Sequence, residues 1–598
     1  MNQDNIIYID CPDQINGALI LCRELKNVLI VSTDPRTVLE LEQQGVDVER
    51  LENHYKEADL NRIVENWQPE IWELFRKIDK ELAEHYPLIK SNGLKPVERS
   101  GSAIMLKIAN HAAAIYICQT FMDKFKDARL FLPDMAEYGP IYSVFENISD
   151  CNRHYVWAFD NIYKKKEWYR WVNEKTGVTP PFKSLLNEKR KNIVYRFASR
   201  IKTSFSRRKK LLLHLDYGQL SERIKEMKRY NHISIEILFS DIQTTDGFEK
   251  QQKYREKKND LWIMDVEFGH LIENDIQYII DHFLFELKAL DEWVNSNPKK
   301  FTKFCGVICN QSLYNPQLAI IAEYLTSRGL TLFHYQHGGG YGAQHIPKFI
   351  KTDFACIENN HIFCVWGEAV KAYSQTLKPP VVNCIAIGWK SLNDKIRKPS
   401  DQIDKVIYVP GNMRYESGGL RPLPYGDYPC TSYYEMQKRI VDAIAPNTVH
   451  PFTVKLHPNA KRPTPIEMYA KKRGYEVIFA NDKLKERIDD STLIVTDHPS
   501  TTYCEALALG CTVMLFQDQV ALKAMEDAMV LMEESSYVHT DFDGFIEAVR
   551  NAVENPDGIK PKNNLTYLKN YVFNENGDSE LRKIITMSDC GEASWQKF

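Results

Sequence analysis

Short apolar runs and amphipathic segments alternate regularly over residues 405–516. The runs VIYVPG, TVKLHP, EVIFAN, TLIVTD and TVMLF have the length of buried strands. Between them, apolar residues recur at helical spacing in residues 433–444, in residues 466–473 and from Thr501 onward. Strands that alternate with helices in this way predict a doubly wound parallel sheet.

The same alternation occupies two other parts of the chain. Near the amino end, apolar runs at residues 5–10 and 27–34 flank a helix-like segment at 15–26. Strand patterns return at residues 233–241, 304–311, 331–334 and 361–368, with a helix expected at 315–328. From about residue 56 to 205, apolar residues stand at helical spacing among charged and aromatic side chains, which predicts a helical insertion.

These patterns predict an α/β protein with two Rossmann-type lobes and a helical insertion in the N-terminal lobe. We expect the following division: residues 1–55 and 211–390 form the N-terminal lobe, 56–210 the insertion, 405–555 the C-terminal lobe and 556–598 a helical tail. The polar segment 391–404 is the expected linker between the lobes. No G-x-G-x-x-G follows the first strand, which argues against a dehydrogenase-type dinucleotide domain.

Composition narrows the function classes. The 598 residues carry a formal net charge of −3, so overall charge gives no reason to expect a nucleic-acid partner. The thirteen cysteines include no C-x-x-C pair, which indicates neither a zinc site nor a disulfide framework. No apolar run reaches the length of a membrane span, and we therefore expect a soluble cytoplasmic protein.

The first candidate for chemistry is the turn that follows the apolar run at residues 492–496. Hydroxyl side chains at Ser500, Thr501 and Thr502 fall where the next helix is expected to begin, and Glu505 stands one helical turn after Thr501. Helix starts offer unpaired N–H groups and favour anions. The segment therefore predicts a phosphate-binding turn, although any capped helix between two strands gives a similar pattern.

A second segment supports a ligand at this edge. The predicted strand 452–456 ends in His457 and Pro458. Because carboxyl ends of parallel strands meet at one edge, His457 is expected to share a ligand with Ser500 to Thr502. An imidazole beside hydroxyls suits the phosphate of a nucleotide. The alternative is that His457-Pro458 only terminates the strand.

The glycine-rich segment YQHGGGYGAQH follows another predicted strand. Gly338 and Gly339 allow the backbone to approach a ligand closely, and His337 stands at the start of the turn. We expect His337, or one of the acids Glu358 and Glu368, to accept the proton of an acceptor hydroxyl. A purely structural turn is the alternative.

Two basic features remain open. Arg414, in the loop after the strand at 405–411, is placed to reach a donor or an acidic sugar, or to form a structural ion pair. The stretch between Lys183 and Lys210 alternates basic with apolar residues, as a helix at a membrane surface does. A solvated basic helix and a site for an anionic acceptor are its other interpretations.

The QHG turn, the KLHP segment and the hydroxyl-rich turn together resemble GT-B glycosyltransferases of bacterial surface carbohydrates. The His-Pro and Ser/Thr pair is similar to that of transferases using CMP-activated acidic sugars of the sialic acid and Kdo type, and the QHG turn resembles that of capsule Kdo transferases. The whole chain also resembles a group of bacterial transferases assigned to surface-carbohydrate synthesis. The motifs cover roughly residues 334–516.

The resemblance implies a GT-B-like fold and a metal-independent glycosyltransferase at the inner face of the cytoplasmic membrane. It would move an acidic sugar from a CMP donor to a bacterial surface glycan, glycolipid or protein, without a further cofactor. His457, Ser500 and Thr501 would bind the donor phosphate, and Glu505 the ribose. The chain lacks the Asp/Glu-Asp-Gly motif that supplies the base in several sialyltransferases, so the resemblance identifies no base.

Four alternatives remain. The first is a CDP-polyol phosphotransferase, and the second is a GT-B transferase that uses a UDP- or GDP-sugar. The third is a nucleotide-sugar epimerase, which would be expected to carry a DSGG-like turn where this chain has DHPSTT. The fourth is a glycan-binding protein without activity.

Overall fold

The computed structural model describes several long stretches of the chain and a number of isolated strands. The described residues are 4–9, 11–54, 57–133, 169–171, 210–214, 233–237, 262–263, 266–267, 285–302, 304–309, 316–336, 338–344, 361–377, 383–411, 430–457, 463–479, 482, 484–519 and 523–588.

A six-stranded parallel sheet forms the C-terminal lobe, residues 405–554. In spatial order its strands are β16 (Glu476–Ile478), β15 (Phe452–Lys455), β14 (Lys405–Val409), β17 (Thr492–Thr496), β18 (Thr512–Phe516) and β19 (Tyr537–His539). Its helices are α16 (Cys430–Ile444), α17 (Pro465–Lys472), η8 (Leu484–Glu486), α18 (Thr501–Ala508), α19 (Glu526–Ser535) and α20 (Phe542–Glu554).

Both faces of this sheet are buried, which explains why its strands are almost wholly apolar. Successive side chains of a strand point to opposite faces. Val406 and Tyr408 belong to a core with α16, α17 and α20, whereas Ile407 and Val409 belong to a second core with α18 and α19. The predicted doubly wound sheet is confirmed.

A second six-stranded parallel sheet forms the middle lobe, residues 210–393. In spatial order its strands are β13 (Cys384–Ala386), β12 (His361–Val365), β11 (Thr331–Tyr335), β10 (Phe304–Cys309), β6 (Lys210–His214) and β7 (Ile233–Ile237). Its helices are α11 (Phe285–Ser296), α12 (Pro298–Phe301), α13 (Pro316–Ser327), α14 (Glu368–Thr376) and α15 (Lys390–Asn393), and β8 (Trp262–Ile263) pairs with β9 (Val266–Glu267). The expected α/β class with two lobes built on parallel sheets is therefore confirmed.

The amino-terminal strands form a third sheet. Its strands, in order, are β3 (Val48–Arg50), β2 (Val28–Ser32), β1 (Asn5–Ile9), β4 (Arg129–Pro133) and β5 (Tyr169–Trp171). Its helices are η1 (Pro12–Gln14), α1 (Ile15–Glu24), α2 (Pro35–Gln43) and η2 (Leu51–His54). The structure thus differs from the predicted single lobe of residues 1–55 and 211–390. β1 pairs with β4 from the predicted insertion, a choice that apolar periodicity does not specify.

This N-terminal sheet touches the C-terminal lobe through α2 and β3. Leu39 of α2 is buried in the core that contains α16 and α17. Arg50 forms an ion pair with Glu435 of α16 at 3.2 Å. These contacts join residues near the amino end of the chain to the lobe that carries the Ser500 turn.

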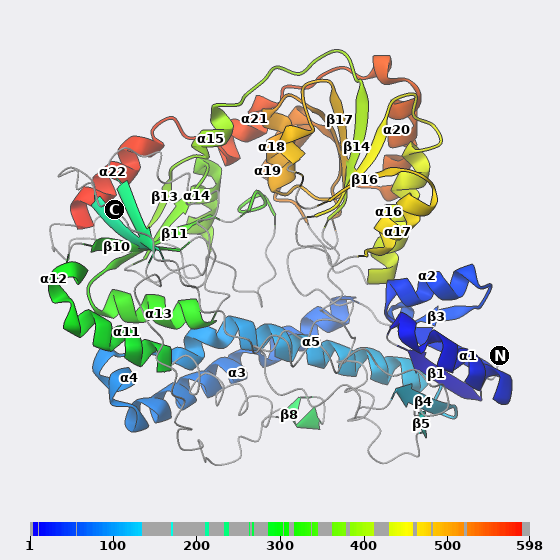
Figure 1. The fold of residues 1–598 in the computed structure, drawn as a ribbon, viewed down its shortest axis with the longest axis horizontal. Helices are drawn as coiled ribbons and strands as arrows, with labels where there is room; N and C mark the ends of the chain where they lie inside the picture. The colour runs from blue at the N-terminus through cyan, green and yellow to red at the C-terminus, as the bar shows by residue number, and fades with distance from the viewer. Residues whose placement is uncertain are drawn as a thin grey trace.

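Two long helices form an arm between the N-terminal sheet and the middle lobe (Figure 1). They are α3 (Glu57–His85) and α5 (Pro96–Lys124), each 29 residues long, and they are joined through α4 (Pro87–Asn92). They pack against each other, and α5 packs on α13 of the middle lobe. Among the helices that the structure describes, none is both long and apolar enough to cross a bilayer.

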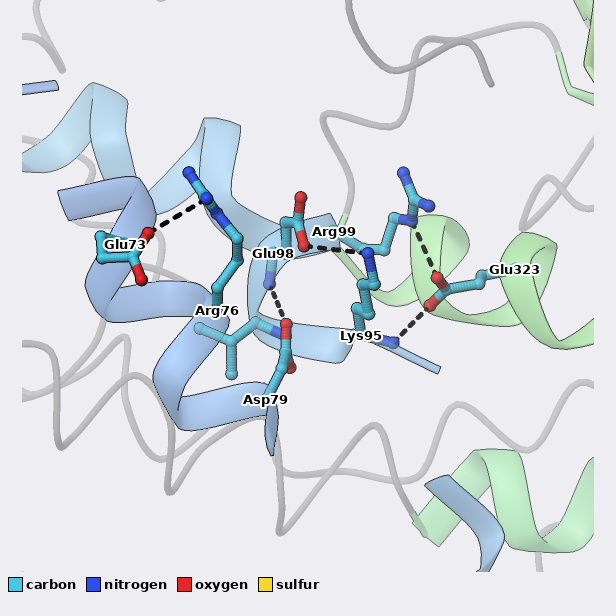
Figure 2. A network of polar contacts seen from close by, with 8 residues as sticks. Glu73, Arg76, Asp79, Lys95, Glu98, Arg99 and Glu323 are labelled. Carbon is cyan, nitrogen blue, oxygen red and sulfur yellow. Dashed lines mark hydrogen bonds and ion pairs between the residues drawn. The ribbon is translucent and has the colours of Figure 1, made fainter. Parts of the chain in front are cut away.

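Asp79 of α3 caps the start of α5 (Figure 2). Its two carboxylate oxygens accept hydrogen bonds from the backbone N–H groups of Val97 and Glu98, each at 2.8 Å. The N-cap residue Lys95 makes no side-chain cap of its own. Burial raises the pKa of Asp79 to about 7, against the lowering effect of these two hydrogen bonds. A carboxyl group from another helix therefore replaces the usual N-cap side chain.

Glu323 of α13 ties the same helix start to the middle lobe (Figure 2). It accepts a hydrogen bond from the Lys95 backbone N–H at 2.9 Å and pairs with Arg99 Nε at 3.0 Å. Both side chains of the ion pair are only 13% exposed. The first turn of α5 is thus held by acids from two other helices.

The carboxyl-terminal segment returns to the middle lobe through η9 (Pro556–Gly558), α21 (Leu565–Tyr571) and α22 (Gly577–Ser588). The Trp389 N–H donates to the Val572 carbonyl at 2.8 Å, and Asn574 Nδ2 donates to the Ala386 carbonyl at 2.8 Å. Tyr567 is buried in the core that joins the middle and C-terminal lobes. The predicted tail is helical over these ranges, and it connects the two lobes.

Candidate functional site

The order in which strands are added to the C-terminal sheet reverses between β14 and β17. β15 and β16 extend it on one side of β14, and β17, β18 and β19 extend it on the other. Loops that leave two such strands diverge, so ligands of parallel α/β sheets bind outside the carboxyl ends at this switch point. Gly411 follows β14 there, and residues 497–500 follow β17. The candidate site therefore centres on the Ser500 turn.

The Ser500 turn, residues 497–500, leads directly into α18. Ser500 is the N-cap residue, and its Oγ accepts a hydrogen bond from the Thr502 N–H at 3.3 Å. Residues 497–499 are buried, whereas Thr501 and Thr502 are only half-buried. The positive end of the helix dipole and accessible hydroxyls favour an anion at this position.

The glycine turn, residues 338–344, packs against the Ser500 turn. A Cβ on Gly339 would lie 2.7 Å from the Ser500 carbonyl oxygen and 2.9 Å from Cys504 Sγ, so the site requires glycine. Tyr567 donates a hydrogen bond to the Gly339 carbonyl at 3.4 Å. The structure therefore brings Gly339 of the middle lobe against Ser500 of the C-terminal lobe, and Gly338 directly precedes this contact.

Both ends of the glycine turn are fixed. Gln336 is fully buried, and its Nε2 donates to the Gly338 carbonyl at 2.6 Å while its Oε1 accepts from the Trp366 N–H at 2.8 Å. At the other end, the Met525 N–H donates to the Ala343 carbonyl at 2.9 Å. The glycine turn is thus anchored in the middle lobe and attached to the C-terminal lobe.

His457 is half-buried just after the carboxyl end of β15. Lys455, the last residue of β15, is buried, and its Nζ donates to two backbone carbonyl oxygens at 2.9 and 3.0 Å. Burial lowers the pKa of Lys455, and the carboxylates of Asp482 and Glu505 oppose this effect.

Asp497 is a member of this site that sequence reasoning did not single out. Its buried carboxylate accepts hydrogen bonds from the Tyr408 and Tyr433 hydroxyls at 2.7 and 3.0 Å, and from the Gly411 N–H at 2.7 Å. Burial raises its pKa, whereas these hydrogen bonds oppose the rise. The signal in the sequence was an acid placed immediately after an apolar strand.

Glu368, a candidate base, begins α14 after the carboxyl end of β12. Its Oε1 accepts a hydrogen bond from Asn574 at 2.9 Å, and its Oε2 pairs with Lys371 at 3.7 Å. Its side chain is 61% exposed. These contacts connect Glu368 to the tail and to its own helix rather than to the Ser500 turn.

The other expected site residues lie outside the described residues: His337, Glu358, Arg414 and Pro458. The basic stretch from Lys183 also lies outside them, apart from Lys210 at the start of β6. Within the described ranges, no group of three or more His, Cys, Asp or Glu side chains is arranged to hold a metal ion.

A parallel sheet with helices packed on both faces defines an α/β protein of the doubly wound class. The chain belongs to the LIC12162 family of transferases, whose family model matches residues 142–534. No curated protein matches it.

Solved structures with related architecture are distant. S. aureus MnaA with UDP is 10% identical at a TM-score of 0.38, and the match covers 64% of this chain and 98% of that one. Arabidopsis thaliana UGT89C1 with UDP-L-rhamnose is 10% identical at a TM-score of 0.31, and the match covers 63% of this chain and 91% of that one. The wall teichoic acid polymerase TagF is 11% identical at a TM-score of 0.28, and the match covers 48% of this chain and 72% of that one.

Proposed function

We propose that this transferase moves a sugar from a nucleotide donor to a bacterial surface glycan, glycolipid or protein. We further propose that the sugar is acidic, of the Kdo or nonulosonic type, and that the donor nucleotide is CMP. One observation carries the proposal: the Ser500-capped start of α18 lies at the switch point of the C-terminal sheet and directly against the glycine turn of the middle lobe.

The proposed donor site uses the residues around this contact. The helix start, with Ser500, Thr501 and Thr502, would offset the negative charge that grows on the departing phosphate. His457 would donate a hydrogen bond to the same phosphate from the end of β15. Glu505, one helical turn further along α18, would hold the ribose hydroxyls.

The acceptor would approach from the middle lobe. His337 is the proposed base, because it stands in the sequence between the buried residues Gln336 and Gly338 and two residues before Gly339, which packs against Ser500. Glu358 and Glu368 are the other candidates. The existing partners of Glu368, Asn574 and Lys371, favour His337 over it.

Calorimetric titration with CMP, CDP, UDP and GDP tests the donor. We expect CMP to bind most tightly. Both a CMP-sugar and a CDP-polyol release CMP, so turnover of CMP-sugars against CDP-glycerol and CDP-ribitol separates the glycosyltransferase from the CDP-polyol phosphotransferase. Binding of UDP or GDP alone would replace the CMP donor while keeping the site. Absence of binding by all four nucleotides would overturn the proposed function.

The chain provides a matched pair for testing His457. β15 is flanked by His457 at its carboxyl end and by His450 before its amino end. We expect His457→Ala to lower nucleotide affinity and turnover by about tenfold or more, which corresponds to about 1.4 kcal/mol. His450→Ala should leave both unchanged. Equal effects of the two substitutions would remove His457 from the site.

A further inference from the structure

Asp497 occupies the position where the two halves of the C-terminal sheet diverge. It directly follows β17, and its neighbour Thr496 already fastens β17 to β14 by donating to the Val409 carbonyl at 2.9 Å. The strands also pair through their backbones, with Val409 opposite Thr496. Asp497 is therefore not needed to hold the two strands together.

The contacts of Asp497 reach beyond the strands. Its Oδ1 accepts from the N–H of Gly411, the second residue after β14, and its Oδ2 accepts from the hydroxyl of Tyr433 in the first part of α16. A side chain at Gly411 would overlap the Tyr433 hydroxyl. One carboxylate thus sets the positions of two segments that leave the switch point.

Burying a carboxylate is unfavourable unless it is fully hydrogen-bonded or paired with a cation. Asp497 is 7% exposed, and no Lys, Arg or His of the described residues forms an ion pair with it. Its three donors are two tyrosine hydroxyls and one backbone N–H. The two strands are already joined without Asp497, so the cost of burying its carboxyl group beside a candidate phosphate turn indicates a further role.

We infer that Asp497 is a positioning residue for the nucleotide: it fixes Gly411 and Tyr433 relative to the Ser500 turn, so that the carboxyl edge of the sheet has its binding shape before the nucleotide arrives. The inference rests on the proposed function, because it concerns the same candidate site. A preformed site binds more tightly, since its segments need no ordering when the ligand arrives.

Two tyrosines allow this role to be separated from stability. Tyr433 reaches Asp497 from α16, beyond the strands, whereas Tyr408 reaches it from within β14 and is fully buried. Tyr433→Phe and Tyr408→Phe each remove one hydroxyl from the same carboxylate. Asp497→Ala removes all three hydrogen bonds. Asp497→Asn keeps an acceptor for Gly411, and its amide can donate to the hydroxyls.

The experiment measures the dissociation constant of the nucleotide that binds the wild type, together with Tm, for the four variants. We expect Asp497→Ala to weaken binding by about tenfold, and Tyr433→Phe by about threefold without a change in Tm. Asp497→Asn should stay close to the wild type. Tyr408→Phe should lower Tm while leaving the dissociation constant unchanged.

Each contrary result has a distinct meaning. Wild-type affinity in folded Asp497→Ala and Tyr433→Phe overturns the positioning role while leaving the proposed function intact. Equal loss of affinity in the two tyrosine variants also overturns it, because the effect then follows stability. If Asp497→Ala does not fold, the tyrosine pair decides alone. A wild type that binds none of CMP, CDP, UDP and GDP overturns both the role and the proposed function.

Discussion

Two helices of this protein begin in opposite ways. The start of α5 is held by acids from other elements: Asp79 of α3 accepts two of its backbone N–H groups, and Glu323 of α13 accepts the N–H that precedes it. The start of α18 is capped by its own Ser500, beside half-buried threonines and a backbone turn from another lobe. The first helix start is closed by carboxylates, whereas the second offers hydroxyls and a positive dipole.

The difference shows how one backbone property serves two purposes. Every helix begins with N–H groups that need acceptors. At α5 the carboxyl groups of Asp79 and Glu323 accept these N–H groups, and the helix start becomes a joint between elements. At α18 the cap is the hydroxyl of Ser500, and the proposed function places an external anion at the positive end of the helix dipole. The following predictions test this distinction, from the largest expected effect to the smallest.

Asp79→Ala should lower the free energy of unfolding by about 2 to 4 kcal/mol, because two buried N–H groups lose their acceptor. Urea unfolding measures this, and nucleotide affinity should not change. Glu73→Ala is the control on the same helix. Glu73 pairs with Arg76 at 3.0 Å while 74% exposed, so its loss should cost less than about 0.5 kcal/mol. If both substitutions lowered the free energy of unfolding by similar amounts, Asp79 would not be a stabilising cap of α5.

Gly339→Ala should lower stability by about 1 to 3 kcal/mol and weaken nucleotide binding, because the new methyl group would press on the Ser500 carbonyl. Gly340→Ala is the matched control. A Cβ there would meet the end of the Gln344 side chain at 2.8 Å and the Pro499 carbonyl only at 3.8 Å. A side chain can move where a backbone carbonyl cannot. Calorimetry and thermal unfolding of both variants would show whether the Ser500 turn depends on this contact.

The α5 joint should make stability depend on pH. The pKa of Asp79 is raised from 3.8 to about 7 in the folded protein, so the folded state retains a proton that the unfolded state has lost. Its contribution is complete below pH 4 and is lost as pH rises through 7; between pH 5 and 7 the loss is about 2 to 3 kcal/mol, at about 1.4 kcal/mol per pH unit. Unfolding free energies of the wild type and Asp79→Asn between pH 5 and 8 measure it. Parallel curves would show that Asp79 does not titrate in this range.

Ser500→Ala should cost about 1 kcal/mol of stability and also weaken nucleotide binding. Thr464 offers a control of identical chemistry, since its hydroxyl caps α17 by accepting from the Glu467 N–H at 3.1 Å. Thr464→Ala should cost a similar amount of stability with unchanged affinity. Thermal unfolding and calorimetry compare the two caps. A loss of affinity in both variants would mean that capping alone, and no ligand contact, explains Ser500.

The sequence predicted local structure well because apolar periodicity reports burial directly. The strand expected at residues 492–496 is β17, and the helix expected from Thr501 is α18. The expectation that several candidate residues gather at one edge followed from the rule for parallel sheets. Whether His457 and Ser500 share one ligand stays a prediction.

Long-range choices were not predictable in this way. β4 has an ordinary apolar pattern, and nothing in it indicates that it pairs with β1, more than one hundred residues earlier. The cap on α5 is similarly hidden. Lys95 at the N-cap position shows that a cap is missing, but only the packing of α3 on α5 identifies Asp79 as the substitute. Such partners depend on tertiary packing rather than on local propensity.

The ion pair between Arg50 and Glu435 connects the N-terminal sheet directly to the C-terminal lobe, so that the parts of the protein form a closed ring of contacts. The arm joins the N-terminal sheet to the middle lobe, the tail and glycine turn join the middle lobe to the C-terminal lobe, and this ion pair links residues 385 positions apart. If this ion pair formed first, it would close the longest loop and cost the most chain entropy. Contacts that form earlier elsewhere in the ring shorten the loop that the ion pair must close. We therefore expect the face between α2 and α16 to form last during folding, and to exchange its amide hydrogens earliest in the native protein.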